Sequence, residues 1–494
     1  MEEKNDSVII EIPGDLKQWS ECMIYRVPRK LRKENETNFT PQLVSIGPFH
    51  HGRSELKGME PHKEKYLDDF CKRTDKTEED LGNFVSEHSK EILAAYAGTI
   101  EEFPLQVFDQ MILRDSCFIL ELLCLFAEKK YHDQDDYILR TTWLRNAIKL
   151  DLVLFENQLP FSFLEKLYAF AEPRHEIENL LGSSQVQTIP YPDSEEGCGI
   201  NSCIHFIKGI LSFKFSHCVS GPKNPEEDIN SSTSRNSTDN DDHTLLKITY
   251  NFFANLCPGI GAGKEFDRKE IKHFTDLFRH FWLSRDFNEG RKLGSPFKHE
   301  KYLYSATKLN KAGVKFVPSA NEQASLVEFN ITERRPLFNI IPFLNTLKVE
   351  LPPFEIQGNT ETLMGNVIAL EQCLYPDKAY ICNYVALMSQ LVDTVEDIEF
   401  LVEKRIIKNM LGSNTEVADL VNRLSYRITE SHFVYAIKCK QLNKFYETKF
   451  NVLRATLKRV YFNDLWTGSS TVLGLCILLF SVSSTIKTLF FPEH

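Results

Sequence analysis

The stretch DQMILRDSCFILELLCLFAEKKY, residues 109–131, is apolar from Cys117 to Phe126 except for Glu121. A helix with apolar side chains on every side is buried, because no face of it suits water. We therefore expect this helix at the centre of the core. The spacing of apolar residues also predicts helices around it, joined by short polar turns, at 62–73, 78–96 and 159–171.

The second half of the chain mixes strand and helix signals. Short β-branched runs at 312–317, 325–331 and 346–356, cut by Pro and Gly, predict a small sheet. Thr394 and Asp397 then form a capping-box pattern before a helix expected at 398–411, with Gly412 where the helix should stop. A second cap near Asn414 and Thr415 opens a helix at 416–428. The expected fold is mainly α, a helix-rich globular body with a small β element in its C-terminal half and one C-terminal transmembrane helix.

The composition excludes some classes of protein. A net charge of -11 repels phosphate backbones, so we expect no nucleic acid partner. A mean hydropathy of -0.29 excludes a polytopic membrane protein. Twelve cysteines without a regular spacing indicate reduced thiols, and the polar, acidic start lacks the pattern of a secretory signal peptide. We therefore expect a cytosolic body.

The C-terminal stretch 465–486 holds no charged residue and lies between Asp464 and Lys487. As a helix its 22 residues reach about 33 Å, enough for a hydrocarbon core of about 30 Å. We predict a single-pass, tail-anchored protein of the plasma membrane or an endomembrane, although a buried core helix is the alternative. The residues expected to meet lipid are Trp466, Leu473, Leu475, Ile477, Leu478, Leu479, Phe480 and Ile486.

Positive charge lies on the body side of this stretch, and the flanking bias places that side in the cytosol. The juxtamembrane cations are Lys449, Arg454, Lys458 and Arg459. They belong to a basic stretch, 438–459, whose helical spacing predicts either a face near anionic headgroups or a solvated surface. The expected organisation is a tail at 1–20, a globular domain at 21–464 with a disordered loop at 220–243, a transmembrane helix at 465–489 and a short tail at 490–494.

Two stretches of the chain resemble known catalytic or nucleotide-binding motifs but lack residues that these motifs require. The stretch PGIGAGKEF at 258–266 lacks the first glycine and the hydroxyl residue of a phosphate loop, and HEIEN at 175–179 lacks the second histidine of a zinc protease. One cluster has enough ligands for zinc but not the paired short spacings of structural sites: Cys198, Cys203, His205, His217 and Cys218. Ordinary core thiols are the stronger interpretation, and no cofactor is expected.

The stretch VSIGPFHHG, residues 44–52, presents His50 and His51 between glycines. Adjacent side chains on an extended segment point to opposite sides, so one metal ion does not readily take both. We favour histidines that hold a turn whose backbone is set by Gly47, Pro48 and Gly52. Glu156 is the carboxylate that would complete an acid/base site with the histidines.

Three further acids, Asp115, Glu121 and Asp151, stand in apolar surroundings. Two carboxylates brought together by the fold would share a proton and work as an acid/base pair. We favour structural roles for these acids, as caps or as acceptors of backbone hydrogen bonds, since no nucleophile or binding loop accompanies them.

A set of short motifs resembles the plant family called domain of unknown function 247. In order they are IYRVPRKLR, FTPQLVSIGPFHHG, LKGMEPHKEKYL, FILELL, LFENQLPF, AGVKF, ALEQC, YICNY and NTEVADLVNRL. The resemblance runs from about Cys22 to about Leu489. It implies a helix-rich body with one C-terminal membrane segment, and no established activity. Some grass members are implicated in self-incompatibility as pollen-side determinants, which implies recognition.

These observations favour a membrane-anchored plant protein that is not an enzyme and binds other proteins in recognition or signalling. The first alternative is an unrecognised hydrolase or transferase that uses Glu156, His50 and His51. The second is a module that binds lipid surfaces through the basic helix.

Overall fold

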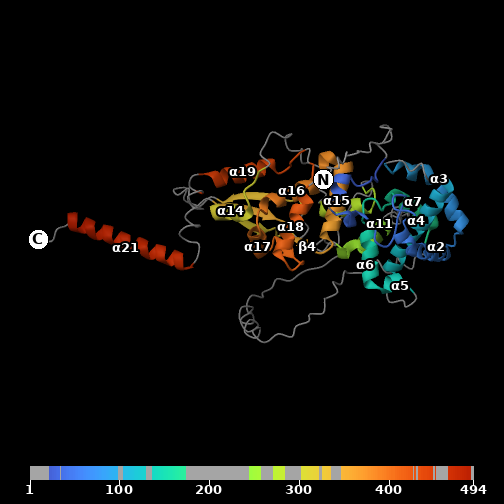
Figure 1. Ribbon diagram of the computed structural model, residues 1–494, viewed down its shortest axis with the longest axis horizontal. Coiled ribbons are helices and arrows are strands. Elements are labelled where there is room, and N and C mark those ends of the chain that lie inside the picture. Colours follow the sequence, from blue (N-terminus) through green and yellow to red (C-terminus); the bar gives the residue numbers. More distant parts are fainter. Residues whose placement is uncertain are drawn as a thin grey trace, which may run out of the picture. The chain divides into compact units, whose positions relative to one another are not determined.

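The computed structural model describes thirteen stretches of the chain (Figure 1). They are residues 22–33, 35–97, 104–128, 136–173, 244–256, 271–283, 302–321, 325–334, 346–426, 428–429, 432–448, 451 and 465–490. The chain divides into two compact units, one formed by 1–177 with 245–494 and the other by 178–244. The predicted disordered loop at 220–243 lies outside the described residues.

Helix α4 (Leu105–Ala127) is the centre of the N-terminal half. It packs against α2 (Glu60–Thr74), α3 (Glu78–Ala94) and α7 (Phe161–Ala171), which surround it in Figure 1. Every residue of α4 from Cys117 to Cys124 is buried. The apolar run therefore forms the core helix that the sequence predicts. Helix α3 begins at a capping box, in which Thr77 and Asp80 each satisfy the other's backbone N–H.

Shorter elements connect these helices. Before α2 they are α1 (Arg29–Arg32), η2 (Glu36–Phe39) and η3 (Ser54–Met59). Before α7 they are α5 (Tyr137–Arg140) and α6 (Thr142–Asp151). Three further elements follow at α11 (Thr244–Phe253), η5 (Ala254–Leu256) and α12 (Phe274–Trp282). All residues of α12 are buried, so this helix belongs to the core as well.

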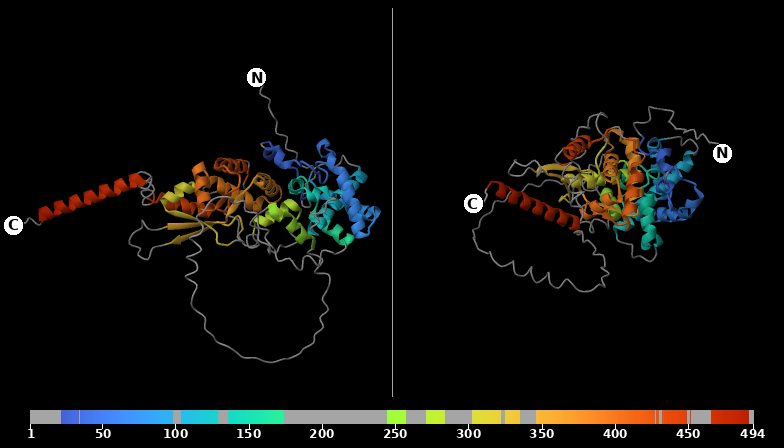
Figure 2. Two further views of the ribbon diagram at one scale, coloured as in Figure 1. Left: turned by 90° about the horizontal axis from the view of Figure 1, so that it is seen from below. Right: turned by 60° about the vertical axis from the view of Figure 1, so that its left-hand side comes forward.

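The predicted small sheet is present in the C-terminal half. Strand β3 (Thr346–Leu351) runs parallel to β1 (Val314–Pro318) and antiparallel to β2 (Asn330–Arg334). The strand order is β1-β3-β2. The strands of the sheet are drawn as yellow to orange arrows in the left view of Figure 2. Helix α14 (Ala306–Ala312) leads into β1 through Gly313, whose φ of 111° suits glycine. The helix-rich fold with a small β element is thus confirmed.

Helices dominate the rest of this half. They are α15 (Thr360–Leu374), η8 (Pro376–Lys378), α16 (Tyr380–Leu391), α17 (Val395–Glu403), α18 (Asn414–Ser425), α19 (Ala436–Glu447) and α21 (Leu465–Phe490). The capping box of Thr394 and Asp397 opens α17 as predicted. The N-cap of α18 is Ser413, one residue before the predicted position. The side chain of Ser413 accepts the backbone N–H of Glu416.

The helix predicted at 398–411 is wrong in its second half. Helix α17 ends at Glu403, and Arg405 takes a left-handed φ of 58°. The residues that follow form β5 (Ile407–Asn409), which pairs in parallel with β4 (Phe354–Ile356). A strand partner more than fifty residues away in the sequence therefore outweighs the local helical pattern. Gly412, with a φ of 88°, turns the chain toward α18.

A buried ion pair joins α12 to α15. Nε of Arg279 lies 2.9 Å from Oε1 of Glu371, and Nη2 of Arg279 donates to the carbonyl of Lys378 at 2.9 Å. The second oxygen of Glu371 accepts the N–H of Cys382 at 2.9 Å. Both side chains are almost fully buried, and these added hydrogen bonds offset the cost of burying two charges.

Among the residues that the structure describes, no helix is long and apolar enough to cross a membrane. The transmembrane helix predicted at 465–489 is therefore not confirmed. Helix α21 covers the predicted stretch, and its apolar centre runs from Val472 to Phe480. Hydroxyl side chains lie on both sides of this centre, at 469–471, 481 and 483–485.

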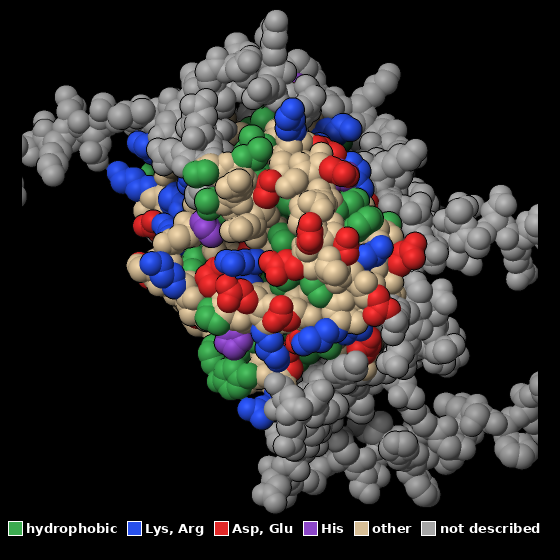
Figure 3. All heavy atoms as spheres, turned by 90° about the vertical axis from the view of Figure 1, so that its right-hand side faces the viewer, with side chains coloured by type: hydrophobic (Ala, Val, Ile, Leu, Met, Phe, Trp, Pro, Cys, Tyr) green, Lys and Arg blue, Asp and Glu red, His purple; other side chains and the backbone are tan. Residues whose placement is uncertain are grey.

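The face of the body in Figure 3 carries acidic and basic side chains interspersed with small apolar groups.

Candidate functional site

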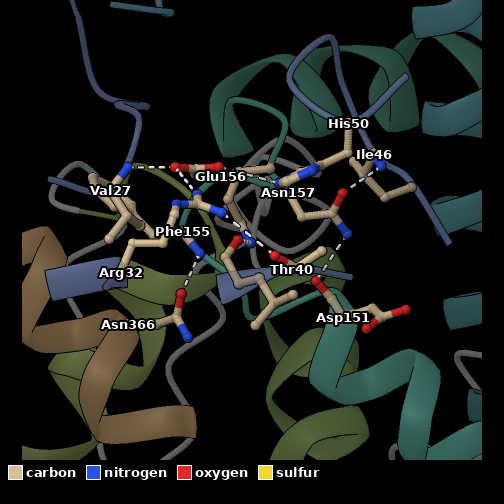
Figure 4. Close-up of polar contacts among 12 residues, drawn as sticks. Val27, Arg32, Thr40, Ile46, His50, Asp151, Phe155, Glu156, Asn157 and Asn366 are labelled. Atoms are coloured by element: carbon tan, nitrogen blue, oxygen red, sulfur yellow. Dashed lines mark hydrogen bonds and ion pairs between the residues drawn. The ribbon is translucent and has the colours of Figure 1, made fainter. Parts of the chain in front are cut away.

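The loop 151–158, which starts at the last residue of α6 and leads toward α7, gathers buried polar side chains. Asp151, Glu156, Asn157 and Gln158 are each at most 3% exposed. A buried polar group without a hydrogen bond costs free energy, so each of these side chains needs a partner. The partners lie mainly in the N-terminal segment, residues 22–52. Figure 4 shows how this segment meets the loop 151–158.

Asp151 accepts three successive backbone N–H groups of the N-terminal segment. Oδ1 accepts from Gln42 at 2.9 Å, and Oδ2 accepts from Leu43 at 2.7 Å and from Val44 at 2.9 Å. Burial raises the pKa of Asp151 to about 6, although the three hydrogen bonds act in the opposite direction. Asp151 is therefore a structural acceptor, as the sequence favoured.

Glu156 joins three parts of the chain. One oxygen accepts the N–H of Val27 and pairs with the guanidinium of Arg32, and the other lies 3.2 Å from Nε2 of His50 (Figure 4). Burial alone would raise the pKa of Glu156, but the hydrogen bond from His50 and the charge of Arg32 outweigh it and lower the pKa. Burial lowers the pKa of His50 and outweighs Glu156, so the imidazole is neutral at pH 7.

The two amides of the loop extend the same network. Asn157 accepts the N–H of Ile46 at 2.6 Å and donates to the carbonyl of Val44 at 3.0 Å. Gln158 accepts the N–H of Phe274, at the start of α12, at 2.9 Å. Neither amide was predicted as a site residue from the sequence. Their position directly after the apolar run 152–155 and Glu156 is the signal that could have identified them.

A further bond ties the loop to the C-terminal half. The N–H of Phe155 donates to Oδ1 of Asn366 on α15 at 2.9 Å, and Nδ2 of Asn366 donates to the carbonyl of Asn38 at 2.8 Å. Asn366 therefore holds the loop and the N-terminal segment together from the other half of the fold.

We call residues 47–52, which include His50 and His51, the histidine turn. It begins at Gly47, whose φ is 69°. Its N–H donates to Oδ2 of Asp115 at 2.8 Å, and the other oxygen of Asp115 lies 2.7 Å from Nζ of Lys63. A Cβ atom at Gly47 would lie 2.7 Å from the hydroxyl of Tyr96 and 2.9 Å from the carbonyl of Gln158. Glycine is required here both for the backbone angle and for the space.

The other predicted site residues lie apart from this cluster or outside the described residues. His51 is half-buried, whereas His50 is 2% exposed, and the contact to Glu156 comes from His50. Glu121 pairs with Arg73, so Asp115 and Glu121 hold separate cations rather than one shared proton. The zinc candidates Cys198, Cys203, His205, His217 and Cys218 fall outside the described residues, as do the basic Lys449, Arg454, Lys458 and Arg459.

Within the described ranges, no group of three His, Cys, Asp or Glu side chains could hold a metal ion. What the cluster offers chemically is one neutral imidazole against one carboxylate, the pairing that orients a general base. Both side chains are buried, at 2% and 1% exposure, and the carboxylate already holds Arg32 and a backbone N–H. The geometry therefore suits a clamp between segments.

The family described as plant protein of unknown function, DUF247, matches residues 24–480. The chain belongs to the DUF247 family. The match includes the N-terminal segment from Ile24, the loop 151–158 and most of α21. The resemblance found in the short motifs is thereby confirmed over nearly the whole chain.

Two relatives of the chain come from Arabidopsis thaliana. The UPF0481 protein At3g47200 is 25% identical over 481 residues, which are 95% of this chain and 86% of the relative. The putative UPF0481 protein At3g02645 is 24% identical over 518 residues, covering 95% of this chain and 90% of the relative. No solved structure matches the chain.

The turn at Gly47 predicts unequal effects for two glycine substitutions. Gly52 also has a positive φ, 78°, but a Cβ atom there would meet nothing within 4 Å. Gly52→Ala should lower the free energy of unfolding by about 1 kcal/mol through backbone strain alone. Gly47→Ala adds a clash with buried atoms and should cost more than about 3 kcal/mol. Urea unfolding measures both, and equal losses would contradict the close packing at Gly47.

The raised pKa of Asp151 predicts that the free energy of unfolding increases on mild acidification. Its folded pKa of about 6 lies above the usual value near 4, so the folded state binds more protons between these pH values. The free energy of unfolding of the wild type should therefore increase, relative to Asp151→Asn, as pH falls from about 6 to about 4. Asp151→Asn should also cost about 2 kcal/mol at pH 7, since its amide N–H₂ meets backbone donors. The exposed Asp393→Asn is the control, and a parallel pH dependence of both variants would contradict this assignment.

His50 predicts the opposite pH dependence. Because its folded pKa is lowered, the unfolded state binds more protons below pH 6.5 and the fold loses stability there. His50→Gln should therefore make the free energy of unfolding fall less steeply between about pH 7 and about pH 5. Chemical unfolding at both pH values tests this, with the half-buried His62→Gln as the control. An unchanged slope in His50→Gln would show that the buried imidazole is not responsible.

Proposed function

We propose that this DUF247 protein is a membrane-attached interaction module that is not an enzyme. In this proposal α21 attaches the protein to a lipid bilayer, and the helical body binds other proteins in recognition or signalling. The proposed location is the plasma membrane or an endomembrane of a plant cell, with the body in the cytosol and a single membrane segment at the tail.

The exposed apolar surface of α21 carries this proposal. Eight of its side chains are between 48% and 77% exposed: Val472, Leu473, Leu475, Ile477, Leu478, Leu479, Phe480 and Val482. Burying one such side chain gains about 1.5 to 3 kcal/mol, so a surface of this size is unfavourable in water. The helix carries no charged side chain before Lys487, and the absence of charge over this length favours entry into lipid.

The flanking charges support the orientation. Four cations precede α21 within sixteen residues, Lys449, Arg454, Lys458 and Arg459, whereas Lys487 is the one that follows the apolar centre. Cytoplasmic flanks of membrane segments carry such an excess of Lys and Arg. Protease treatment of sealed microsomes tests this side assignment: digestion of the body supports it, and a protected body contradicts it.

An exposed aromatic group at α5 and α6 supports a protein partner. Tyr137 is 52% exposed and Trp143 is 63% exposed, and the guanidinium of Arg140 lies 5.8 Å from the ring centre of Tyr137. Tyr, Trp and Arg are the residue types that contribute most binding energy in protein interfaces. These three residues are therefore the proposed contact of the body with a protein.

The 3.2 Å contact between His50 and Glu156 favours the alternative of a hydrolase or transferase. Two observations oppose the enzyme alternative: both groups are buried, and Glu156 holds the N-terminal segment in place. His50→Gln and Glu156→Gln distinguish the two functions. Loss of a measured turnover with the fold intact supports the enzyme, and loss of stability without any turnover in the wild type supports the clamp.

Replacing two apolar residues of α21 tests the attachment. Leu478→Asp with Phe480→Asp places two carboxylates in the apolar centre, each at a cost of about 3 kcal/mol in a membrane interior. The wild type should float with liposomes in a density gradient, and this variant should remain in the aqueous fraction. The matched control is Met410→Asp with Tyr426→Asp, two exposed apolar residues of the body. A wild type that stays in the aqueous fraction, or a variant that floats as well as the control, contradicts membrane attachment.

A further inference from the structure

Helix α19 presents one outward face of unusual composition. Ile437, Lys440, Gln441 and Lys444 lie on one side of a helix with 3.6 residues per turn, and all four are exposed. We call these four residues the α19 outer face. The opposite side of the helix buries Cys439, Leu442 and Asn443.

The α19 outer face combines apolar and cationic groups. Ile437 is 76% exposed, among the most exposed large apolar side chains of the body. Lys440 and Lys444 follow it at three and seven positions, and neither forms an ion pair with any described residue. Lys438, on another side of the helix, instead donates to the carbonyl of Phe329 and is half-buried. Glu447, three positions after Lys444, is exposed on the same side and accepts the hydroxyl of Tyr304 at 3.2 Å, so this side carries two cations and one acid. Two cations beside an exposed isoleucine suit a surface that offers anions and an apolar layer together.

Three tyrosines contact α19 on its other side. Nδ2 of Asn443 donates to the carbonyl of Tyr302 at 2.6 Å. The ring of Tyr302 lies 5.1 Å from that of Tyr304, which stacks on Tyr446 of α19 at 4.0 Å. Tyr446 follows Ile437 by nine positions, half a turn round the helix from the α19 outer face. These contacts therefore hold α19 on the body and leave its outer face uncovered by the tyrosines.

We propose that the α19 outer face binds the headgroup layer of an anionic lipid bilayer. This inference rests on the proposed membrane attachment through α21. It adds that the body itself lies against the bilayer, and that the charge of the lipids controls this contact.

The position of α19 in the chain favours a bilayer over a protein as the occupant. Seventeen residues, 448–464, separate α19 from α21, and they carry four cations against the single acid Asp464. Even fully extended, they span at most about 60 Å. Attachment through α21 therefore keeps α19 near the membrane at an effective concentration of about a millimolar. At that concentration a contact too weak to recruit the protein by itself is populated.

Charge complementarity selects anionic lipid. The cytoplasmic leaflet carries a negative surface potential that attracts Lys and Arg close to the membrane. The chain as a whole carries a net charge of -11, which such a leaflet repels. A local cationic face next to the attachment point allows the body to approach the bilayer in one orientation only.

Lysine labelling of the full-length protein in nanodiscs tests the contact. One set of nanodiscs contains phosphatidylcholine alone, and the other contains phosphatidylcholine with about 30% phosphatidylserine. Acetylation is followed by mass spectrometry at each lysine. Lys440 and Lys444 should react about threefold more slowly in the anionic nanodiscs. The exposed Lys57 and Lys90 of the N-terminal half should react equally in both. Salt of about 1 M, which screens charges beyond about 3 Å, should abolish the difference.

A charge-reversed variant provides the matched comparison. Lys444→Glu should restore the reactivity of Lys440 in anionic nanodiscs to its value in neutral ones, whereas Lys57→Glu should leave Lys440 protected. Equal reactivity of Lys440 in both lipids, for protein that has entered both, overturns this inference alone. Protection that is independent of lipid charge but increases with protein concentration also overturns it, because a second copy then covers the face. Failure to enter either nanodisc overturns the membrane attachment itself.

Discussion

Side-chain acceptors hold an N-terminal segment that has few partners of its own in helices or sheets. Six backbone N–H groups, those of Val27, Gln42, Leu43, Val44, Ile46 and Gly47, donate to buried side chains of Asp115, Asp151, Glu156 and Asn157. A buried backbone donor without an acceptor costs free energy, so these few side chains decide whether the segment can be buried at all. The histidine turn, the contact of His50 with Glu156 and the link through Asn366 to α15 all depend on this arrangement.

The same arrangement limits what the ionisable groups can do chemically. Glu156 is held by Arg32, His50 and a backbone N–H, and Asp151 by three backbone N–H groups. A carboxylate used in this way stabilises the fold in one protonation state, and a catalytic cycle would have to break those bonds. The proposed function therefore uses exposed groups and not the buried cluster. These groups are the apolar face of α21, the aromatic residues of α5 and α6, and the cationic face of α19.

Local patterns in the sequence predicted the local structure well. The apolar run from Cys117 to Phe126 identified the core helix because burial on all sides leaves a continuous signal. The β-branched runs at 312–317 and 346–356 coincide with β1, β3 and β4, whereas the run at 325–331 overlaps β2 only at Asn330 and Ile331. The glycines of the histidine turn have the positive φ that a turn requires. The helix expected at 398–411 was wrong after Glu403, because the pairing of β5 with β4 depends on residues more than fifty positions away. No local pattern contains that information.

The candidate site, too, depends on contacts between distant residues that the sequence alone does not reveal. His50 and Glu156 were both candidates from the sequence, but their contact and the part played by Arg32 depend on the fold bringing together segments more than a hundred residues apart. Asn157 and Gln158 were missed because a buried amide looks like a surface residue until its acceptors and donors are known.

Native-state hydrogen exchange at the six N–H groups tests whether the buried side-chain acceptors hold the N-terminal segment. These N–H groups should exchange only upon global unfolding, as slowly as the amides of α4. Exchange orders of magnitude faster than in α4, in a protein that is otherwise folded, would contradict this role of the acceptors.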